Sequence, residues 1–261
     1  MAPTTPALRV CIDRIIPSDE RKIAAAAHAI KENRANAPVL PPLSGISAHP
    51  LKLALMTGKR WAKGRALDVR FLDGSAKQQE KVKTNASHWM NFANVKLNFG
   101  TKAQAQIRIS FVADPGSWSA VGTDCLLTDA FPAASPTMNF GWLTDETDDV
   151  EYRRVVTHEF GHALGAIHEH QNPRGGIVWN LPAVYAYFSG PPNNWTKEEI
   201  DHNVVQKYSV DQLNATTFDP ASIMLYSFPK ELLASGHATA NNTDLSAGDK
   251  AFIAKMYPRQ A

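Results

Sequence analysis

The sequence predicts an α+β fold, with a sheet and its helices in the N-terminal half and an irregular C-terminal half. Between residues 66 and 112, strand-like and helix-like segments follow one another in the order β-α-β-β. After Gly165 the composition shifts to turns and short helical stretches. The chain has 261 residues, 44% of them hydrophobic and 20% charged. This suits one globular domain divided by a cleft.

The first 60 residues are irregular and rich in proline, apart from an Ala-rich helix expected at about 18–33. We interpret residues 1–60 as an N-terminal strap or a pro-like segment. The main domain is expected at residues 61–261, with subdomains at about 61–165 and 166–261.

The first strong strand is expected at residues 66–72, where apolar and polar side chains alternate with a period of two. Asp73-Gly74 then ends the strand. The elements expected next are a helix at about 75–93, strands at 95–99 and 106–112, and a loop-rich insertion at 114–136.

A longer helix is expected at about 147–164, because its first turn is acidic, as the positive end of the helix dipole favours. In the C-terminal half, Thr196 and Glu199 form a capping box that begins a helix at 196–208. Shorter helices are expected at 181–188 and 249–256.

Residues 158–168 contain three histidines and a glutamate at the spacing of a catalytic zinc site. His158 and His162 are about 40° apart around a helix, so both imidazoles leave one face. Gly165 can adopt left-handed backbone angles and end the helix, which lets His168 fold back as a third ligand. Three neutral nitrogens leave a position open for water, as in catalytic zinc sites. Glu159 faces that open side, where a carboxylate can act as general base.

A bare His-Glu-x-x-His pattern also occurs by chance in unrelated helices. The extended pattern with Gly and a third His is typical of metzincin peptidases when a Met-turn follows. Ser222-Ile-Met224-Leu-Tyr226 has the character of such a turn. Alone, this run also fits a buried strand with a core methionine. Together, the two motifs indicate a metallopeptidase.

These motifs resemble those of the astacins, a metzincin family. Glu169 follows the third histidine as in astacins, and residues 222–226 resemble their Ser-x-Met-His-Tyr turn. Residues 116–122, Gly-Ser-Trp-Ser-Ala-Val-Gly, are similar to their Cys-Trp-Ser-Tyr-Val-Gly segment without its cysteine. Leu245–Asp249 with Met256-Tyr257 resembles their C-terminal helix, and the whole resemblance covers roughly residues 60–258.

The resemblance implies a zincin-like metzincin fold, one catalytic Zn²⁺ ion and protein or peptide substrates. Met224 would pack beneath the histidines. Tyr226 would be a fifth zinc ligand at rest that swings away to stabilise the oxyanion. The resemblance also implies an edge strand above the cleft, which either pairs with an extended substrate or is purely structural. Its residues would be Thr137, Met138, Asn139, Phe140, Gly141 and Trp142.

The charge balance, 27 basic against 25 acidic residues, points neither to nucleic acid nor to an anionic membrane surface. Only Cys11 and Cys125 are present, so at most one disulfide is possible. The sequence shows neither a signal peptide nor an apolar stretch long enough to span a membrane. We expect a monomer, secreted only if a leader was removed or a leaderless route is used.

We therefore expect a zinc-dependent endopeptidase in which Glu159 is the general base. Two alternatives stay open. One is an effector protease with a single narrow protein target. The other is a catalytically silent zincin that serves as a protein-binding module, although such a module has no use for Glu159.

Cys11 raises a separate question, because a thiolate can replace zinc-bound water and keep a peptidase latent. The residues around it match neither the matrixin nor the astacin latency motif. Its apolar neighbours fit a strap on the outside of the domain, with the thiol as a small buried hydrophobe. We favour this strap, which predicts a full-length protein that is active without processing.

Overall fold

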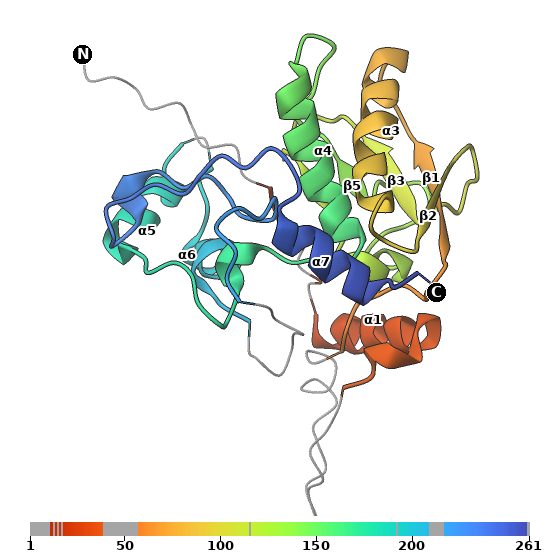
Figure 1. Cartoon of the computed structure of the whole chain (residues 1–261), viewed down its shortest axis with the longest axis horizontal. Helices are drawn as coiled ribbons and strands as arrows, with labels where there is room; N and C mark the ends of the chain where they lie inside the picture. Colours follow the sequence, from red (N-terminus) through yellow and green to blue (C-terminus); the bar gives the residue numbers. More distant parts are fainter. Residues whose placement is uncertain are drawn as a thin grey trace, which may run out of the picture.

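The computed structural model describes residues 11–12, 14, 16, 18–38, 57–114, 116–191, 193–208 and 217–259. The architecture is the expected mixture of helices and a sheet (Figure 1). The sheet has five strands in the order β2-β1-β3-β5-β4. Neighbouring strands are parallel except for β4, which is antiparallel to β5. The strands are β1 (Ala66–Phe71), β2 (Lys96–Phe99), β3 (Ile107–Ser110), β4 (Trp118–Ser119) and β5 (Met138–Asn139).

Two long helices, α3 (Ala76–Met90) and α4 (Asp149–Ala163), pack against each other in the half of the molecule that holds the sheet (Figure 1). Ser75 begins α3, and its side chain and that of Gln78 form a capping box. From α3, Trp89 Nε1 donates a 2.7 Å hydrogen bond to the Thr157 carbonyl of α4. The sequence-based expectations for both helices are confirmed, and this buried bond fixes the position of α4.

In the N-terminal region, α1 (Asp19–Glu32) begins at Ser18, whose side chain accepts the Arg21 N–H. The helix packs on a 3₁₀ turn at Gly122–Leu126. Asn36 Nδ2 donates to the carbonyls of Ala29 and Arg60, at 2.8 Å each. This side chain ties α1 to the start of the main domain. The expected extent of the strap cannot be followed through residues 39–56, which lie outside the described residues.

In the C-terminal half, the capping box of Thr196 and Glu199 is present, but the helix behind it differs from the sequence prediction. Its α-helical part changes to π-helical geometry, which ends at Val205. Asn203 Nδ2 donates to the Glu199 carbonyl, which competes with the regular helical hydrogen bond. The helical elements here are α5 (Leu181–Ser189), α6 (Lys197–Ile200), the π-helix Asp201–Val205, the 3₁₀ turns Glu169–Gln171 and Lys230–Leu232, and α7 (Ala247–Met256).

The edge strand implied for residues 137–142 is wrong. Strand β5 is flanked on both sides, by β3 through Ile109 and by β4 through Trp118. In the order of strands, β4 takes the outer position next to β5. Thr137 to Phe140 are buried, and only Gly141 and Trp142 are partly accessible. The loop-rich insertion folds back to add β4, so it covers the edge that β5 would otherwise present.

Two hydrophobic cores meet at the Met-turn. Ile223 and Met224 belong to the core that contains β1, β3, α3 and α4. The next two residues, Leu225 and Tyr226, belong to the second core, with α5 and Phe228. Cys11 also lies in this second core. The five-residue turn therefore joins the two halves of the molecule.

Candidate metal centre

The first two metal-binding side chains come from α4. Asp148 begins this helix by accepting the Glu151 N–H at 2.8 Å, and the helix then runs through both histidines. His158 and His162 lie one turn apart on one face, and their Nε2 atoms are 3.1 Å apart. The helix thus brings two donor nitrogens to one point, as their spacing predicts.

The third donor depends on how α4 ends. Gly165 has φ +91°, which a residue with a Cβ rarely adopts. Its N–H donates to the His162 carbonyl at 2.7 Å, and the Ala166 N–H donates to the Gly161 carbonyl at 2.9 Å. These two bonds form a Schellman ending. The chain reverses there and places His168 Nε2 3.0 Å from His162 Nε2.

The Nδ1 atoms of the first two histidines face backbone carbonyls. His158 Nδ1 is 2.8 Å from the Ile223 carbonyl oxygen, and His162 Nδ1 is 3.0 Å from that of Ala166. A carbonyl can only accept, so Nδ1 carries the proton and Nε2 keeps its lone pair for a metal. Burial and the two neighbouring imidazoles hold the pKa of His158 well below its usual value. The His158 ring is therefore neutral, as a metal ligand must be.

Cys11 completes the cluster, contrary to the expectation of an inert strap. Donor atoms of Cys11, His158, His162 and His168 all lie within 4.8 Å of one another, and all four residues are buried. The contact joins positions that are 148 residues apart: Cys11 Sγ is 3.1 Å from Glu159 Oε2. The thiol therefore stands beside the carboxylate, on the side that the three histidines leave open.

Tyr226 also reaches this cluster. Its hydroxyl donates to the Cys11 carbonyl at 2.5 Å and is 2.5 Å from His168 Nε2. The ring lies 4.4 Å from the His168 ring, centroid to centroid. His170 also packs against Tyr226, with a centroid distance of 4.8 Å, and its ring stacks 5.1 Å from that of His168. The sequence singled out Tyr226 but did not place His170, which is fully buried, at the site.

The donor set fits zinc. Three neutral imidazole nitrogens bound to one ion at 2.0–2.1 Å would lie about 3.3 Å apart in tetrahedral geometry, close to the separations seen here. A thiolate is the other donor that zinc commonly takes. His158, His162 and His168 would hold the ion, with Cys11 as the fourth ligand in this form of the protein.

The Met-turn supports the histidines from below. A Cβ placed on Gly161 would lie 2.4 Å from Met224 Sδ, so Met224 packs directly against α4. The Glu169 N–H donates to the Met224 carbonyl at 2.9 Å. The turn therefore touches the helix that supplies two histidines and the loop that supplies the third.

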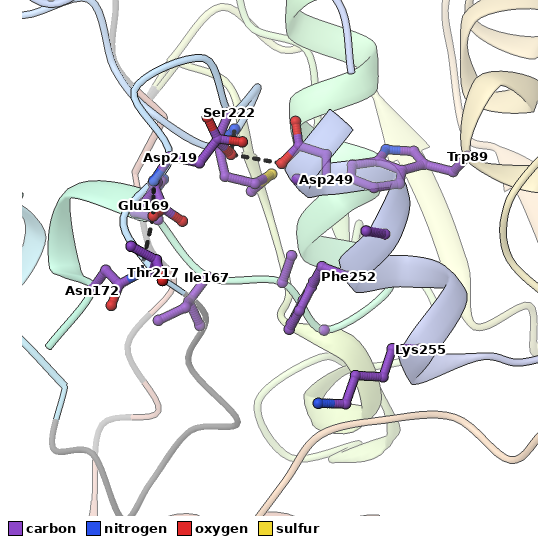
Figure 2. Close-up of a pocket in the computed structure, with 16 residues that line it drawn as sticks. Trp89, Ile167, Glu169, Asn172, Thr217, Asp219, Ser222, Asp249, Phe252 and Lys255 are labelled. Atoms are coloured by element: carbon purple, nitrogen blue, oxygen red, sulfur yellow. Dashed lines mark hydrogen bonds between the residues drawn. The ribbon is translucent and has the colours of Figure 1, made fainter. Parts of the chain in front are cut away.

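A carboxylate from α7 holds the turn itself. Asp249 accepts the Ser222 hydroxyl at 2.7 Å (Figure 2). It accepts the Ile223 N–H at 2.8 Å. It also accepts the Ser246 N–H at 2.9 Å, as part of the capping box of α7. Since the Ile223 carbonyl faces His158, Asp249 acts on the orientation of His158 through the backbone of one residue, Ile223.

Glu169 lines a cavity of about 350 Å³ between the loop at residues 165–172 and α7 (Figure 2). Its Oε1 accepts the Asp219 N–H and Asn172 Nδ2, both at 2.9 Å. Burial raises the pKa of Glu169, and these two hydrogen bonds act against that rise. Glu169 therefore fastens the loop after His168 to the segment that leads into the Met-turn.

Solved structures similar to this chain include two of myroilysin and one of a fish hatching enzyme. The first myroilysin structure is 43% identical, covers 78% of this chain and 97% of its own, and has a TM-score of 0.74. The second is 44% identical over 77% of this chain and 86% of its own, with a TM-score of 0.61. High choriolytic enzyme 1, a hatching enzyme zinc-protease of the medaka fish Oryzias latipes, is 18% identical. It covers 77% of this chain and 96% of its own with a TM-score of 0.53, which shows a shared fold.

No family profile and no curated protein matches the chain. The fold and the donor set nevertheless define the molecule as a zinc metalloendopeptidase of the metzincin class, which acts on proteins or peptides. The identity to myroilysin over most of the chain shows that it belongs to the astacin-like family of these peptidases. In the part of the chain that the structure describes, no helix is long and apolar enough to cross a membrane.

The role of Asp249 can be tested by Asp249→Ala. The change leaves the Ser222 hydroxyl and two backbone N–H groups without their acceptor, so we expect the free energy of unfolding to fall by at least about 2 kcal/mol. Zinc affinity should fall with it, because the carbonyl beside His158 is released. Chemical denaturation and competition with a chelator measure the two effects. Asp244→Ala, at an exposed ion pair with Arg153, is the control, and equal losses in both variants would refute this role.

Proposed function

We propose that the protein cleaves internal peptide bonds with Glu159 as general base. One observation carries this proposal: the atom on the open side of the histidines, Cys11 Sγ, is 3.1 Å from Glu159 Oε2. In the active form, the attacking water stands where this sulfur is now. At such a distance a carboxylate can take a proton directly.

The roles of the residues follow from their positions. When bound, zinc polarises the scissile carbonyl and lowers the pKa of a water molecule to about 7. Glu159 accepts a proton from the attacking water while the oxygen of that water bonds to the carbonyl carbon. It then passes this proton to the amine nitrogen as the peptide bond breaks. Glu159 is 1% exposed, so little bulk water competes with this transfer.

Tyr226 is proposed to stabilise the oxyanion. Its hydroxyl now donates to the Cys11 carbonyl and lies against His168. Departure of Cys11 frees this O–H donor beside the reacting carbonyl. The donor would then act mainly in the transition state, where negative charge develops on the oxygen.

We further propose that this structure represents a latent form, in which Cys11 occupies the site of the attacking water. With zinc bound, the Cys11 sulfur would ligate the ion as a thiolate and exclude that water, and it already lies beside Glu159. The strap favoured from sequence and the latency segment are thus the same stretch of chain. The burial of Cys11 fits either role, but the contact of its thiol with Glu159 favours latency.

The two alternatives predict different chemistry. A silent binding module would keep the fold without turnover, yet Glu159 is buried beside the donor cluster, where an acidic group with no task is costly. An effector protease with one target shares the chemistry and differs in its substrates. A mixed peptide library incubated with the zinc-loaded Cys11→Ala protein separates them: no cleavage favours the module, one product favours the effector, and many products favour a broad endopeptidase.

Cys11→Ala tests latency. Removing the thiol opens the fourth ligand position to water. Hydrolysis by the full-length chain should therefore rise at least about tenfold, which corresponds to an advantage of the thiol over water of about 1.4 kcal/mol at that position. The assay is hydrolysis of a mixed peptide library by zinc-loaded protein. Cys125→Ala removes the other buried thiol, which is not part of the donor cluster, and should change nothing. Equal activity in wild type and Cys11→Ala would restore the inert strap.

Glu159→Gln tests the general base. In the full-length Cys11→Ala protein, this change should retain stoichiometric zinc and lower kcat by about 10²–10⁴-fold, because the proton acceptor is lost and no ligand is touched. Metal analysis and peptide hydrolysis are measured on the same sample. Glu198→Gln, at an exposed glutamate of α6, is the control. Near-normal turnover in Glu159→Gln would contradict the mechanism.

Tyr226→Phe tests the oxyanion donor. Because the phenol acts in the transition state, kcat should fall by about 10–1000-fold while KM changes little. Initial rates in the same Cys11→Ala background separate the two constants. A higher KM at constant kcat would instead mean that Tyr226 binds substrate in its ground state or packs locally.

A further inference from the structure

Ile12, directly after Cys11, contacts the chain beside the outer strand of the sheet. The Ile12 N–H donates to the Ser117 carbonyl at 3.1 Å, and Ser117 directly precedes β4, at the end of the strand order. This is the kind of backbone contact by which an edge strand accepts an added peptide. With its thiol at the metal cluster, this segment occupies the position of a bound peptide.

Arg14 follows this contact and meets an aromatic face. Its Cζ atom lies 4.0 Å from the centre of the Trp118 ring. This distance is well within the range of a cation–π interaction. Partial burial of the guanidinium lowers the pKa of Arg14, although the residue as a whole is exposed. Trp118 itself is only 3% exposed, and its ring is therefore held in one orientation.

A recess of about 420 Å³ lies beside this contact, and both Arg14 and Trp118 line it. Arg14, Ile16 and Arg21 contribute from the N-terminal region. The main domain contributes the remaining walls, which consist of Trp118, Asp129, Ala130, Phe131, Ser135 and Pro136. These walls combine an aromatic face with one carboxylate, and none of them is basic. Such a lining suits a cationic side chain with an apolar stem.

We infer that the recess formed by Trp118 and Asp129 is a substrate subsite that selects arginine, and that Arg14, which stacks on Trp118 at the side of this recess, stands in for the substrate side chain in the latent form. Arginine suits it better than lysine, because a planar guanidinium stacks on an indole ring and is more weakly hydrated. Arg14 is three residues from Cys11, which is about 10 Å in an extended chain. The selected side chain should thus lie two to four residues from the scissile bond. This inference rests on the proposed peptidase activity.

The test uses the full-length Cys11→Ala protein and peptides with one cleavable bond. A single arginine is placed in turn at each of four positions on either side of the bond, with alanine and lysine at the same positions for comparison. We expect arginine at one position to raise kcat/KM roughly 5-fold over alanine, the ratio that corresponds to about 1 kcal/mol for a cation–π contact. Lysine should give a smaller gain.

The preference should depend on both walls of the recess. Trp118→Ala should abolish it and Trp118→Phe should retain part of it, while Asp129→Asn should reduce it without disturbing the core, since Asp129 is exposed. Cleavage of the alanine peptides reports whether each variant still folds. The subsite would be overturned if arginine raised kcat/KM at no position. It would also be overturned if the arginine preference were unchanged in both Trp118→Ala and Asp129→Asn. Failure of every variant to cleave even the alanine peptides would instead count against the proposed function.

Discussion

The contact between His158 Nδ1 and the Ile223 carbonyl, at 2.8 Å, is the interaction on which the rest of the site depends. It joins α4, which belongs to the sheet half, to the turn at which the second core begins. The ring can face the metal only when this carbonyl is in place, because the carbonyl sets the tautomer. The metal centre therefore requires both halves to be folded and in register. Two further contacts stabilise this arrangement. Met224 packs against Gly161, and Asp249 accepts the Ser222 hydroxyl.

The buried charges of the site are arranged so that each has a partner. Glu159 is accompanied by the Cys11 thiol, and Glu169 by an amide and a backbone N–H. Asp249 accepts three hydrogen bonds at once. Carboxylates at such depth are costly unless they are satisfied. Glu169 and Asp249 therefore hold the geometry of the loop at residues 165–172 and of the Met-turn, while Glu159 is the carboxylate to which we assign the proposed chemistry.

Local signals made most of this fold predictable. The two-residue period at 66–72, the capping pair at Ser75 and the acidic turn before α4 each act within a few residues. The spacing of His158, His162 and Gly165 is equally local, and it predicted the donor geometry correctly.

The errors concern contacts between distant segments. Strand β4 has two residues and shows no alternation to detect, so the edge was assigned to its neighbour β5. The Cys11–Glu159 contact spans 148 positions, and the apolar residues around the thiol fitted an outside strap equally well. Only the chemistry of a thiol near a zinc motif pointed to the alternative.

Because Cys11 belongs to the second core, the proposed latency is coupled to the stability of the folded protein. The side chain is 5% exposed and packs with the core that contains Tyr226, Val184 and Phe228. In the activation that we propose, departure of Cys11 would remove a packed side chain from this core and admit water to its inner surface. The form that cleaves peptides would then be the less stable of the two, and would more readily become a substrate for its own copies. Activity released in this way would be self-limiting in time.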